Sequence, residues 1–207
     1  MMPSKLILTI ACIAASAMGF NYRTGSVCDF SGVDLDSLIS RILRQLPDYE
    51  PIHSTVFDNE FAGIELLGLQ IRGLNELRQY GAVIPFCKNG TRMIQADFTH
   101  DGGVSLIVPW RTCFGNEGYL ILQASVSRFT TLFRIEQPSS SQEARLVFDG
   151  PTITVTTEGL TMAIIGGGFY IDILARYISL TFPAMLRVVW NQYFFHIFNQ
   201  FVIEALA

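Results

Sequence analysis

The carboxy-terminal stretch, residues 171–207, constrains the fold most because it is apolar on every face of a helix. A helix that is hydrophobic all round has to be buried all round, in protein or in lipid. The longest run without a charge, residues 188–203, has 16 residues, fewer than the roughly 18 to 20 that cross a bilayer. We therefore expect no transmembrane span, and we expect the rest of the chain to wrap this helix.

Residues 1–19 have the pattern of a secretory signal peptide. Lys5 provides the charged start, residues 6–15 the short apolar core, and Ala15-Ser16-Ala17 the small-residue cleavage site. The apolar core is too short for a membrane anchor. We expect a secreted, extracellular protein whose mature chain, residues 20–207, forms a single domain.

The composition favours a hydrophobic partner. The chain is 50% hydrophobic and only 15% charged, whereas an average soluble domain is about 25% charged. Without Lys5 the mature chain has 13 basic and 18 acidic residues, a net charge of −5. This acidic excess argues against nucleic acid and against strong binding to anionic membranes.

The periodicity predicts one amphipathic helix followed by an antiparallel sheet. Apolar residues at helical spacing predict a helix over 34–46, which Asp34 caps and Pro47 ends. Residues 47–60 look like a connecting loop. From Gly63 onward apolar and polar residues alternate, and turn signals such as Asn89-Gly90 and residues 101–103, 116–118, 138–141 and 149–151 separate the runs. Short connections predict antiparallel neighbours.

Two local signals predict how the sheet and the last helix bend. The alternation slips phase at Leu66-Leu67 and at Arg128-Phe129, where bulges would curl the sheet. Glycines 166–168 end the strand pattern, and Pro183 is the expected site of a kink in the long helix. The predicted fold class is α+β, with a strongly curled antiparallel sheet wrapped around a long C-terminal helix and a shorter N-terminal helix.

Three cysteines follow the signal peptide: Cys28, Cys87 and Cys113. We favour a Cys87–Cys113 disulfide, because both residues are expected near the same end of the strand meander. A strand between them would separate them by roughly 9 to 10 Å unless the strand ends curl, so a bridge from Cys28 stays an alternative. In the favoured pairing Cys28 is left over for a disulfide-linked dimer.

The sequon at Asn89 coincides with the Asn-Gly turn, so we expect an exposed glycan acceptor there. Motifs for metals, phosphate loops, dinucleotides and nucleophile elbows are absent, and His53, His100 and His196 lack metal-ligand spacing. We therefore expect no enzymatic activity, no catalytic residues, no cofactor and no metal.

Residues 169–201 contain ten aromatic residues. Such rings either form a packed core or leave apolar gaps that bind apolar ligands. Polar residues of the same helix (Asn191, Gln192 and His196) either satisfy one another or hold a ligand's head group. The expected ligand-lining residues are apolar and lie on periodic faces: Leu38, Ile42, Leu69, Ile71, Leu106, Val108, Val126, Phe129, Ile173, Tyr177, Trp190, Phe194 and Phe198.

Residues 63–74 read GIELLGLQIRGL, and residues 80–83 read YGAV. This segment, above all residues 70–74, resembles group 7 mite allergens and related arthropod lipid-binding proteins. The order of elements is similar across most of the mature chain. The resemblance implies a tubular lipid-binding fold, like half of a bactericidal/permeability-increasing protein, whose members hold lipids, hormones or other hydrophobic molecules in the tube.

The sequence therefore favours a secreted, non-enzymatic carrier of a hydrophobic ligand such as a fatty acid, a phospholipid or a terpenoid. The alternative is a protein-interaction module with a solidly packed core, whose outer surface binds a partner protein. The mature net charge of −5 lacks the cationic tip of lipopolysaccharide binders, and no ligand-reading residue is carried over from the resemblance.

Overall fold

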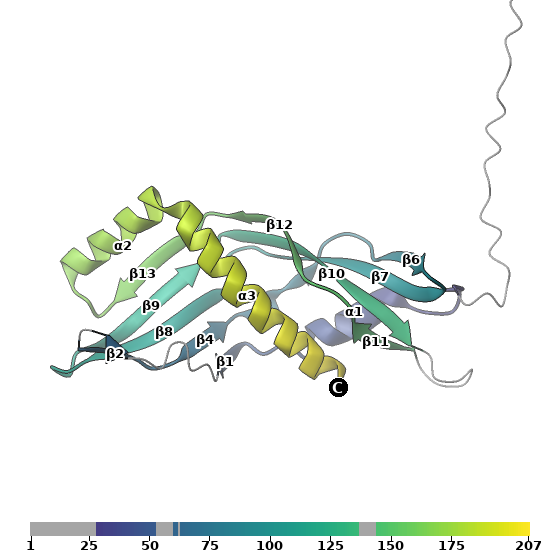
Figure 1. Cartoon of the computed structure of the whole chain (residues 1–207), viewed down its shortest axis with the longest axis horizontal. Helices are drawn as coiled ribbons and strands as arrows, with labels where there is room; N and C mark the ends of the chain where they lie inside the picture. Colours follow the sequence, from purple (N-terminus) through teal and green to yellow (C-terminus); the bar gives the residue numbers. More distant parts are fainter. Residues whose placement is uncertain (1–27, 53–59, 62, 137–143) are drawn as a thin grey trace, which may run out of the picture.

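The computed structural model describes residues 28–52, 60–61, 63–136 and 144–207. The predicted signal peptide and the predicted turn at 138–141 lie outside these ranges. Within them, the chain forms three α-helices and two antiparallel sheets (Figure 1).

Helix α1 (Leu35–Leu43) is the predicted N-terminal helix. The Asp34 carboxylate caps it by accepting a hydrogen bond from the Ser37 amide at 3.0 Å. The helix ends three residues before the predicted position, because the Gln45 amide donates to the Ile42 carbonyl at 3.0 Å and so tightens the last turn. The apolar stripe of α1 is buried, as its spacing predicts.

The first sheet is centred on β8 (Ser105–Thr112). One edge of β8 pairs with β3 (Ile64–Leu66) and β4 (Leu69–Arg72), and the other edge pairs with β9 (Glu117–Gln123). Strand β9 in turn carries β13 (Thr161–Ile165). Short strands β1 (Tyr49–Ile52) and β2 (Glu60–Phe61) pair with β4 and β3. The predicted loop over 47–60 was thus wrong at both ends, and β1 tolerates Pro51 because it is an edge strand.

The second sheet is built on the two longest strands, β7 (Thr91–His100) and β10 (Val126–Glu136). Strands β5 (Arg78–Gln79) and β6 (Ile84–Lys88) pair with the outer edge of β7. Strands β11 (Arg145–Phe148) and β12 (Ile153–Glu158) pair with the outer edge of β10. A short 3-10 helix, η2 (Leu74–Glu76), connects the two sheets.

Both predicted bulges are present, and they curl the sheets. The register between β10 and β12 shifts between Arg128 and Phe129. Along β8, Leu66 lies opposite Trp110 and Gln70 lies opposite Ile107, so four residue steps on one side face three on the other. The extra residue is accommodated beside Gly68, whose φ of 86° is left-handed.

The last helix is divided at Pro183, as predicted. Helix α2 (Phe169–Thr181) and helix α3 (Pro183–Leu206) meet at an angle of 91°. Figure 1 shows α3 running diagonally across the curled sheets towards α1 and β11. The two sheets form a half-barrel around α3, which confirms the predicted fold class. The side chains that α3 buries are Leu186, Trp190, Phe194, Phe195, Ile197, Phe198 and Val202.

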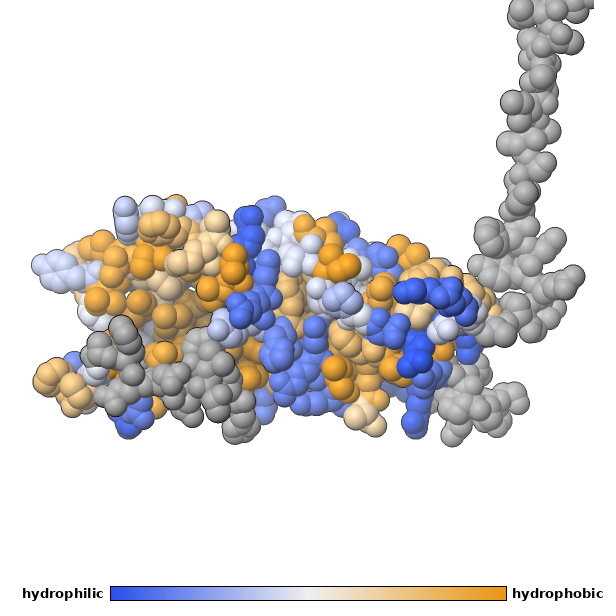
Figure 2. Space-filling model, in the orientation of Figure 1, coloured by the Kyte–Doolittle hydropathy of each residue, from blue (hydrophilic) through white to orange (hydrophobic). Residues whose placement is uncertain are grey.

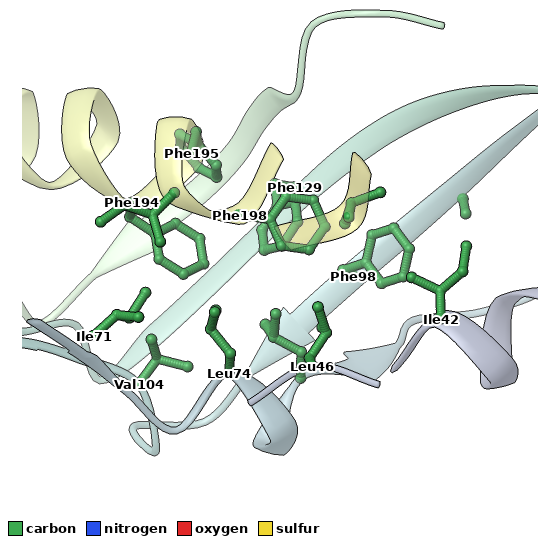
Figure 3. Packing of buried hydrophobic residues seen from close by; sticks show 14 of the residues in the cluster. Ile42, Leu46, Ile71, Leu74, Phe98, Val104, Phe129, Phe194, Phe195 and Phe198 are labelled. Atoms are coloured by element: carbon green, nitrogen blue, oxygen red, sulfur yellow. The ribbon is translucent and has the colours of Figure 1, made fainter. Parts of the chain in front are cut away.

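An aromatic cluster fills the space between α3 and the sheets (Figure 3). Its centre is the Phe129 ring, whose centroid lies 5.5 Å from that of Phe194, 5.3 Å from that of Phe195 and 4.8 Å from that of Phe198. These separations are typical of direct aromatic packing. The centre of the half-barrel is therefore a packed core.

Polar side chains of α3 bond to the sheet that faces them. The Thr157 hydroxyl donates to Asn191 Oδ1 at 3.4 Å, and the Thr152 hydroxyl donates to Asn199 Oδ1. Gln192 and His196 are exposed to solvent. Asn191 thus bonds to the sheet and not to Gln192 or His196, so these three helix residues do not satisfy one another as one of the two expectations had it.

Candidate functional site

An apolar cleft of about 420 Å³ lies between α2 and the inner face of the first sheet. We call it the α2 cleft. Helix α2 contributes one wall and strands β3, β8, β9 and β13 contribute the other. Its lining residues are Ile64, Leu66, Trp110, Thr112, Asn116, Leu120, Ile164, Gly166, Gly167, Ile171 and Leu174.

Alternation along the strands produces the sheet wall of this cleft. On β8, Leu106, Val108 and Trp110 face inwards and are buried, while Arg111 faces outwards. Burial decreases along this inward stripe towards the end of the sheet, and Ile64 on the neighbouring strand is 41% exposed. The cleft is therefore the open continuation of the core, beyond the reach of α3.

Helix α2 is held at one side of the cleft by β13. The Ser179 hydroxyl oxygen accepts a hydrogen bond from the Met162 amide at 2.8 Å and donates to the Ala175 carbonyl at 2.9 Å. Ala175 is fully buried at this contact. The turn before the helix requires glycine, because Gly166 has a φ of 88° and a Cβ there would collide with the Glu117 carbonyl.

The polar groups among the lining residues belong to Thr112 and Asn116, at the mouth of the cleft, and to the Trp110 ring. The Asn116 amide donates to Thr112 Oγ1 at 3.1 Å, which orders the loop between β8 and β9. Trp110 lines the cleft, and its Nε1 atom is buried without a hydrogen-bond acceptor among the described residues. None of the described lining residues is charged. The nearby Arg111–Glu65 ion pair, at 2.7 Å, lies on the outer face of the sheet.

The cleft contains none of the thirteen residues that the sequence predicted as ligand-lining. Ten of them are buried in the hydrophobic core: Leu38, Ile42, Leu69, Ile71, Leu106, Val108, Phe129, Trp190, Phe194 and Phe198. Leu38 and Ile42 also line a smaller pocket of about 220 Å³ between α1, β11 and the end of α3. The ten residues are apolar and inward-facing as predicted, but they contact one another instead of surrounding a tunnel.

Three predicted lining residues were wrong in their placement. Val126 lies on the outer face of the second sheet, because the turn at residues 124–125 changes the phase of the alternation and makes Ser127 the inward residue. Ile173 and Tyr177 are exposed on α2, which the sheets do not enclose. The prediction that the apolar segment is buried on every face was wrong for both helices: α3 buries one side and exposes Met185, Val188 and Ile203, and α2 buries only Ala175.

Several cleft residues could have been found from the sequence by extending the alternation already seen. Trp110 follows Val108 by two positions, and Leu120 precedes Leu122 by two. The residues Ile171 and Leu174 carry no such signal, because their role depends on where α2 packs.

The favoured disulfide was wrong: Cys28 bonds to Cys87, with the two Cα atoms 5.8 Å apart. Cys87 is on β6 of the second sheet, whereas Cys113 follows β8 of the first sheet, so the two residues do not share an end of one meander. A dimer linked through Cys28 is excluded while this bridge stands. Cys113 is free and exposed.

Asn89 occupies the predicted exposed turn between β6 and β7, with a left-handed φ of 52°. Its glycosylation stays a prediction.

Among the described residues, no group of three or more His, Cys, Asp or Glu side chains is arranged to hold a metal ion. In the same part of the chain no single helix has both the length and the hydropathy of a membrane span. Helices α2 and α3 have that length and hydropathy only when they are taken together, and the pair is bent by 91°.

Comparison with known proteins gave no matching family model and no matching curated sequence.

Proposed function

We propose that the chain is a secreted, non-enzymatic binding protein that sequesters or carries a hydrophobic small molecule in the α2 cleft. The observation that carries this proposal is an apolar cleft of about 420 Å³ that is open to solvent beside a packed core. Small-molecule sites in proteins typically have volumes of roughly 300 to 1,000 Å³. The candidate ligand classes are fatty acids, phospholipids and terpenoids.

Desolvation supplies the binding free energy in this proposal. Each methylene group that leaves water contributes about 0.8 kcal/mol. An apolar cavity of roughly 150 Å³ is already enough to bind benzene, and the α2 cleft is larger. The side chains that would contact the apolar body of the ligand include Leu66, Trp110 and Ile164.

The lining favours a neutral polar group on the ligand. A buried carboxylate needs a cation or several hydrogen bonds, and the described lining residues include no cation. The Asn116 side-chain amide at the mouth can donate to a carbonyl, ether or hydroxyl oxygen of the ligand. Among the candidate classes, an alcohol, ester or neutral terpenoid therefore suits the cleft better than a free fatty acid.

The tubular lipid-binding family is the proposed relationship. A half-barrel around one long helix supports it at the level of fold. The proposed ligand position differs from a tunnel along the whole helix, because aromatic rings fill the space beside α3.

A cleft-filling substitution tests the proposal. Leu174 lines the cleft and is 49% exposed, so Leu174→Trp adds bulk there without disturbing the core. We expect this variant to bind a fluorescent long-chain alcohol at least about tenfold more weakly, because roughly two methylene contacts are worth that factor. Leu180→Trp is the matched control, since Leu180 is on the same helix, is 83% exposed and does not line the cleft.

The same protein, purified from a eukaryotic secretion host, is extracted with organic solvent and analysed by mass spectrometry. A stoichiometric neutral lipid in the wild-type extract, depleted in Leu174→Trp, supports the proposal. Equal binding by both tryptophan variants, or an empty extract together with no probe binding, contradicts it.

A second candidate function is a protein-interaction module. The observation that favours it is the exposed apolar surface of α2, including Tyr170 and Leu180, next to a solidly packed core. An empty extract, no probe binding and retention of a partner protein through α2 would favour this candidate over the carrier.

A further inference from the structure

One end of the molecule exposes an apolar surface made by α2 and the loop between β8 and β9. Residues Phe169, Ile173, Tyr177 and Leu180 are spaced by four, four and three positions, so they form one stripe along the outer side of α2. Figure 2 shows hydrophobic residues gathered over this end of the molecule, where Figure 1 places α2.

The β8–β9 loop extends this surface. Phe114 is 89% exposed at the tip of the loop. The loop residues Thr112 and Asn116 line the same cleft as Ile171 of α2, so the loop and the helix lie at the same end. We define the apolar end as the exposed side chains Phe114, Phe169, Tyr170, Ile173, Tyr177 and Leu180.

The area of the apolar end is close to what a stable dimer buries. Its four aromatic side chains, Phe114, Phe169, Tyr170 and Tyr177, are 89%, 73%, 84% and 58% exposed. With about 200 Å² for each ring, they present on the order of 600 Å², and Ile173 and Leu180 add to this. A standard stable interface buries about 800 Å² per partner, and isolated apolar patches this large mark interaction surfaces.

Charge on α2 does not oppose contact between two copies at this surface. Asp172 and Arg176, the two charged residues of α2, pair with each other at 2.9 Å, so the helix has no net charge. Beside the β8–β9 loop, Arg111 pairs with Glu65 and also interacts with Glu117, so these three residues carry one net negative charge.

The free thiol of Cys113, next to Phe114 in the chain, indicates that the partner is a second copy of this chain. Cys113 is exposed and unpaired, whereas Cys28 and Cys87 are oxidised to a disulfide. In a symmetric dimer only a residue that lies close to the twofold axis contacts the same residue of the other copy. An odd exposed cysteine beside an exposed apolar surface therefore fits a second copy of this chain, with Cys113 close to the twofold axis, better than an unrelated partner.

We propose that two copies of the chain associate through the apolar end, and that a Cys113–Cys113 disulfide then links them. In this reaction one Cys113 thiolate attacks a low-molecular-weight disulfide and releases one thiol. The Cys113 thiolate of the second copy attacks the resulting mixed disulfide and releases the second thiol. One sulfur–sulfur bond forms between the copies and the bond of the oxidant is reduced. The proposal does not depend on the ligand-binding function.

The mass of the full mature chain in solution tests the proposal. Under reducing conditions, sedimentation should show a reversible monomer–dimer equilibrium at micromolar concentration. After addition of oxidised glutathione, a non-reducing gel should show a covalent dimer. Cys113→Ser should abolish the covalent dimer and keep the reversible one.

Substitutions on α2 locate the interface. The double variant Ile173→Glu with Leu180→Glu changes two exposed residues and should raise the dimer dissociation constant at least about tenfold, because it places like charges in an apolar contact. Ile153→Glu is the matched control: Ile153 is 55% exposed on β12, outside the apolar end, and should leave the dimer intact. Circular dichroism should confirm that the variants have the same secondary structure.

Two outcomes overturn the proposal. One is a monomer at high micromolar concentration under both redox conditions. The other is a dimer that the double variant of α2 does not weaken. If the monomer instead binds neutral phosphatidylcholine vesicles through α2, the apolar end is a lipid-docking surface and the dimer proposal is wrong.

Discussion

At the scale of single residues, the core contains an unusual polar group. His100 is fully buried on β7, and its ring centroid lies 5.8 Å from both Trp190 and Phe194. Neither ring nitrogen has a hydrogen-bond partner among the described residues. Burial, which outweighs the charge of nearby Asp101, lowers the pKa of His100 to about 4.

This lowered pKa predicts a loss of stability in mild acid. Because the folded pKa, about 4, lies below the ordinary value of 6.5, the unfolded chain binds the proton first as the pH falls. Stability is therefore complete above pH 6.5 and decreases towards pH 4, by roughly 3 kcal/mol from this residue. Thermal unfolding of wild type and His100→Phe at several pH values measures the effect.

We expect His100→Phe to lose much less stability than wild type between pH 7 and pH 4. His196→Phe, the same change on the exposed face of α3, is the control and should retain the wild-type loss. Asp97 does not contribute in this window. Burial opposes its charge, but hydrogen bonds from Thr130 and Arg128 outweigh burial and lower the pKa of this carboxyl below 3.8. Equal pH dependence in wild type and His100→Phe would contradict the assignment.

At the scale of secondary-structure elements, α2 is the exception in the fold. Helix α3 is held by aromatic packing, whereas α2 is held on β13 by the fully buried Ala175 and by the bonds of Ser179. An element with few buried contacts opens at a lower free energy than the rest of the protein. We therefore expect the α2 wall of the cleft to open at a lower free energy than α3.

Loss of the Ser179 hydroxyl should loosen this wall selectively. Ser179→Ala leaves the Met162 amide without its acceptor, which costs about 1 kcal/mol and corresponds to roughly fivefold faster amide exchange. Hydrogen exchange followed by mass spectrometry should show this change in α2 and β13 while α3 is unaffected. Thr181→Ala, an exposed position on α2, is the control. A uniform increase over all helices would mean that α2 does not open by itself.

Elements with a strong local period could be predicted from sequence, whereas the cleft as a whole could not. The stripe of α1, the alternation in β7 to β10, both bulges and the break at Pro183 follow from neighbours in the chain. Strand β13 was missed because Met162, Ala163, Ile164 and Ile165 do not alternate with polar residues. The α2 cleft requires β13 and the position of α2, both of which depend on contacts between distant segments.

At the scale of the whole molecule, the regions around α3 and α2 differ in how fully the apolar side chains of the sheets are buried. Around α3 the expected curled sheet is present, but aromatic rings fill the half-barrel, so the expected apolar tunnel beside this helix was wrong. Around α2 the inner face of the first sheet is left partly open, and both the cleft and the apolar end lie there. Composition predicted an excess of apolar surface, and the structure concentrates it at this end.

The two tryptophans of the chain, Trp110 and Trp190, report on these two regions separately. Trp110 lines the α2 cleft, whereas Trp190 of α3 is fully buried in the core. The variants Trp190→Phe and Trp110→Phe each keep one tryptophan as a fluorescent reporter. A brominated long-chain alcohol quenches only a ring that it contacts.

The most direct test of ligand binding in the α2 cleft is therefore the quenching of tryptophan fluorescence by this brominated alcohol in the two variants. Each variant should first be shown to bind the fluorescent alcohol probe. We predict saturable quenching of Trp110 in Trp190→Phe and unchanged emission of Trp190 in Trp110→Phe. Quenching of Trp190 alone, or of neither tryptophan at saturating ligand, would contradict the account.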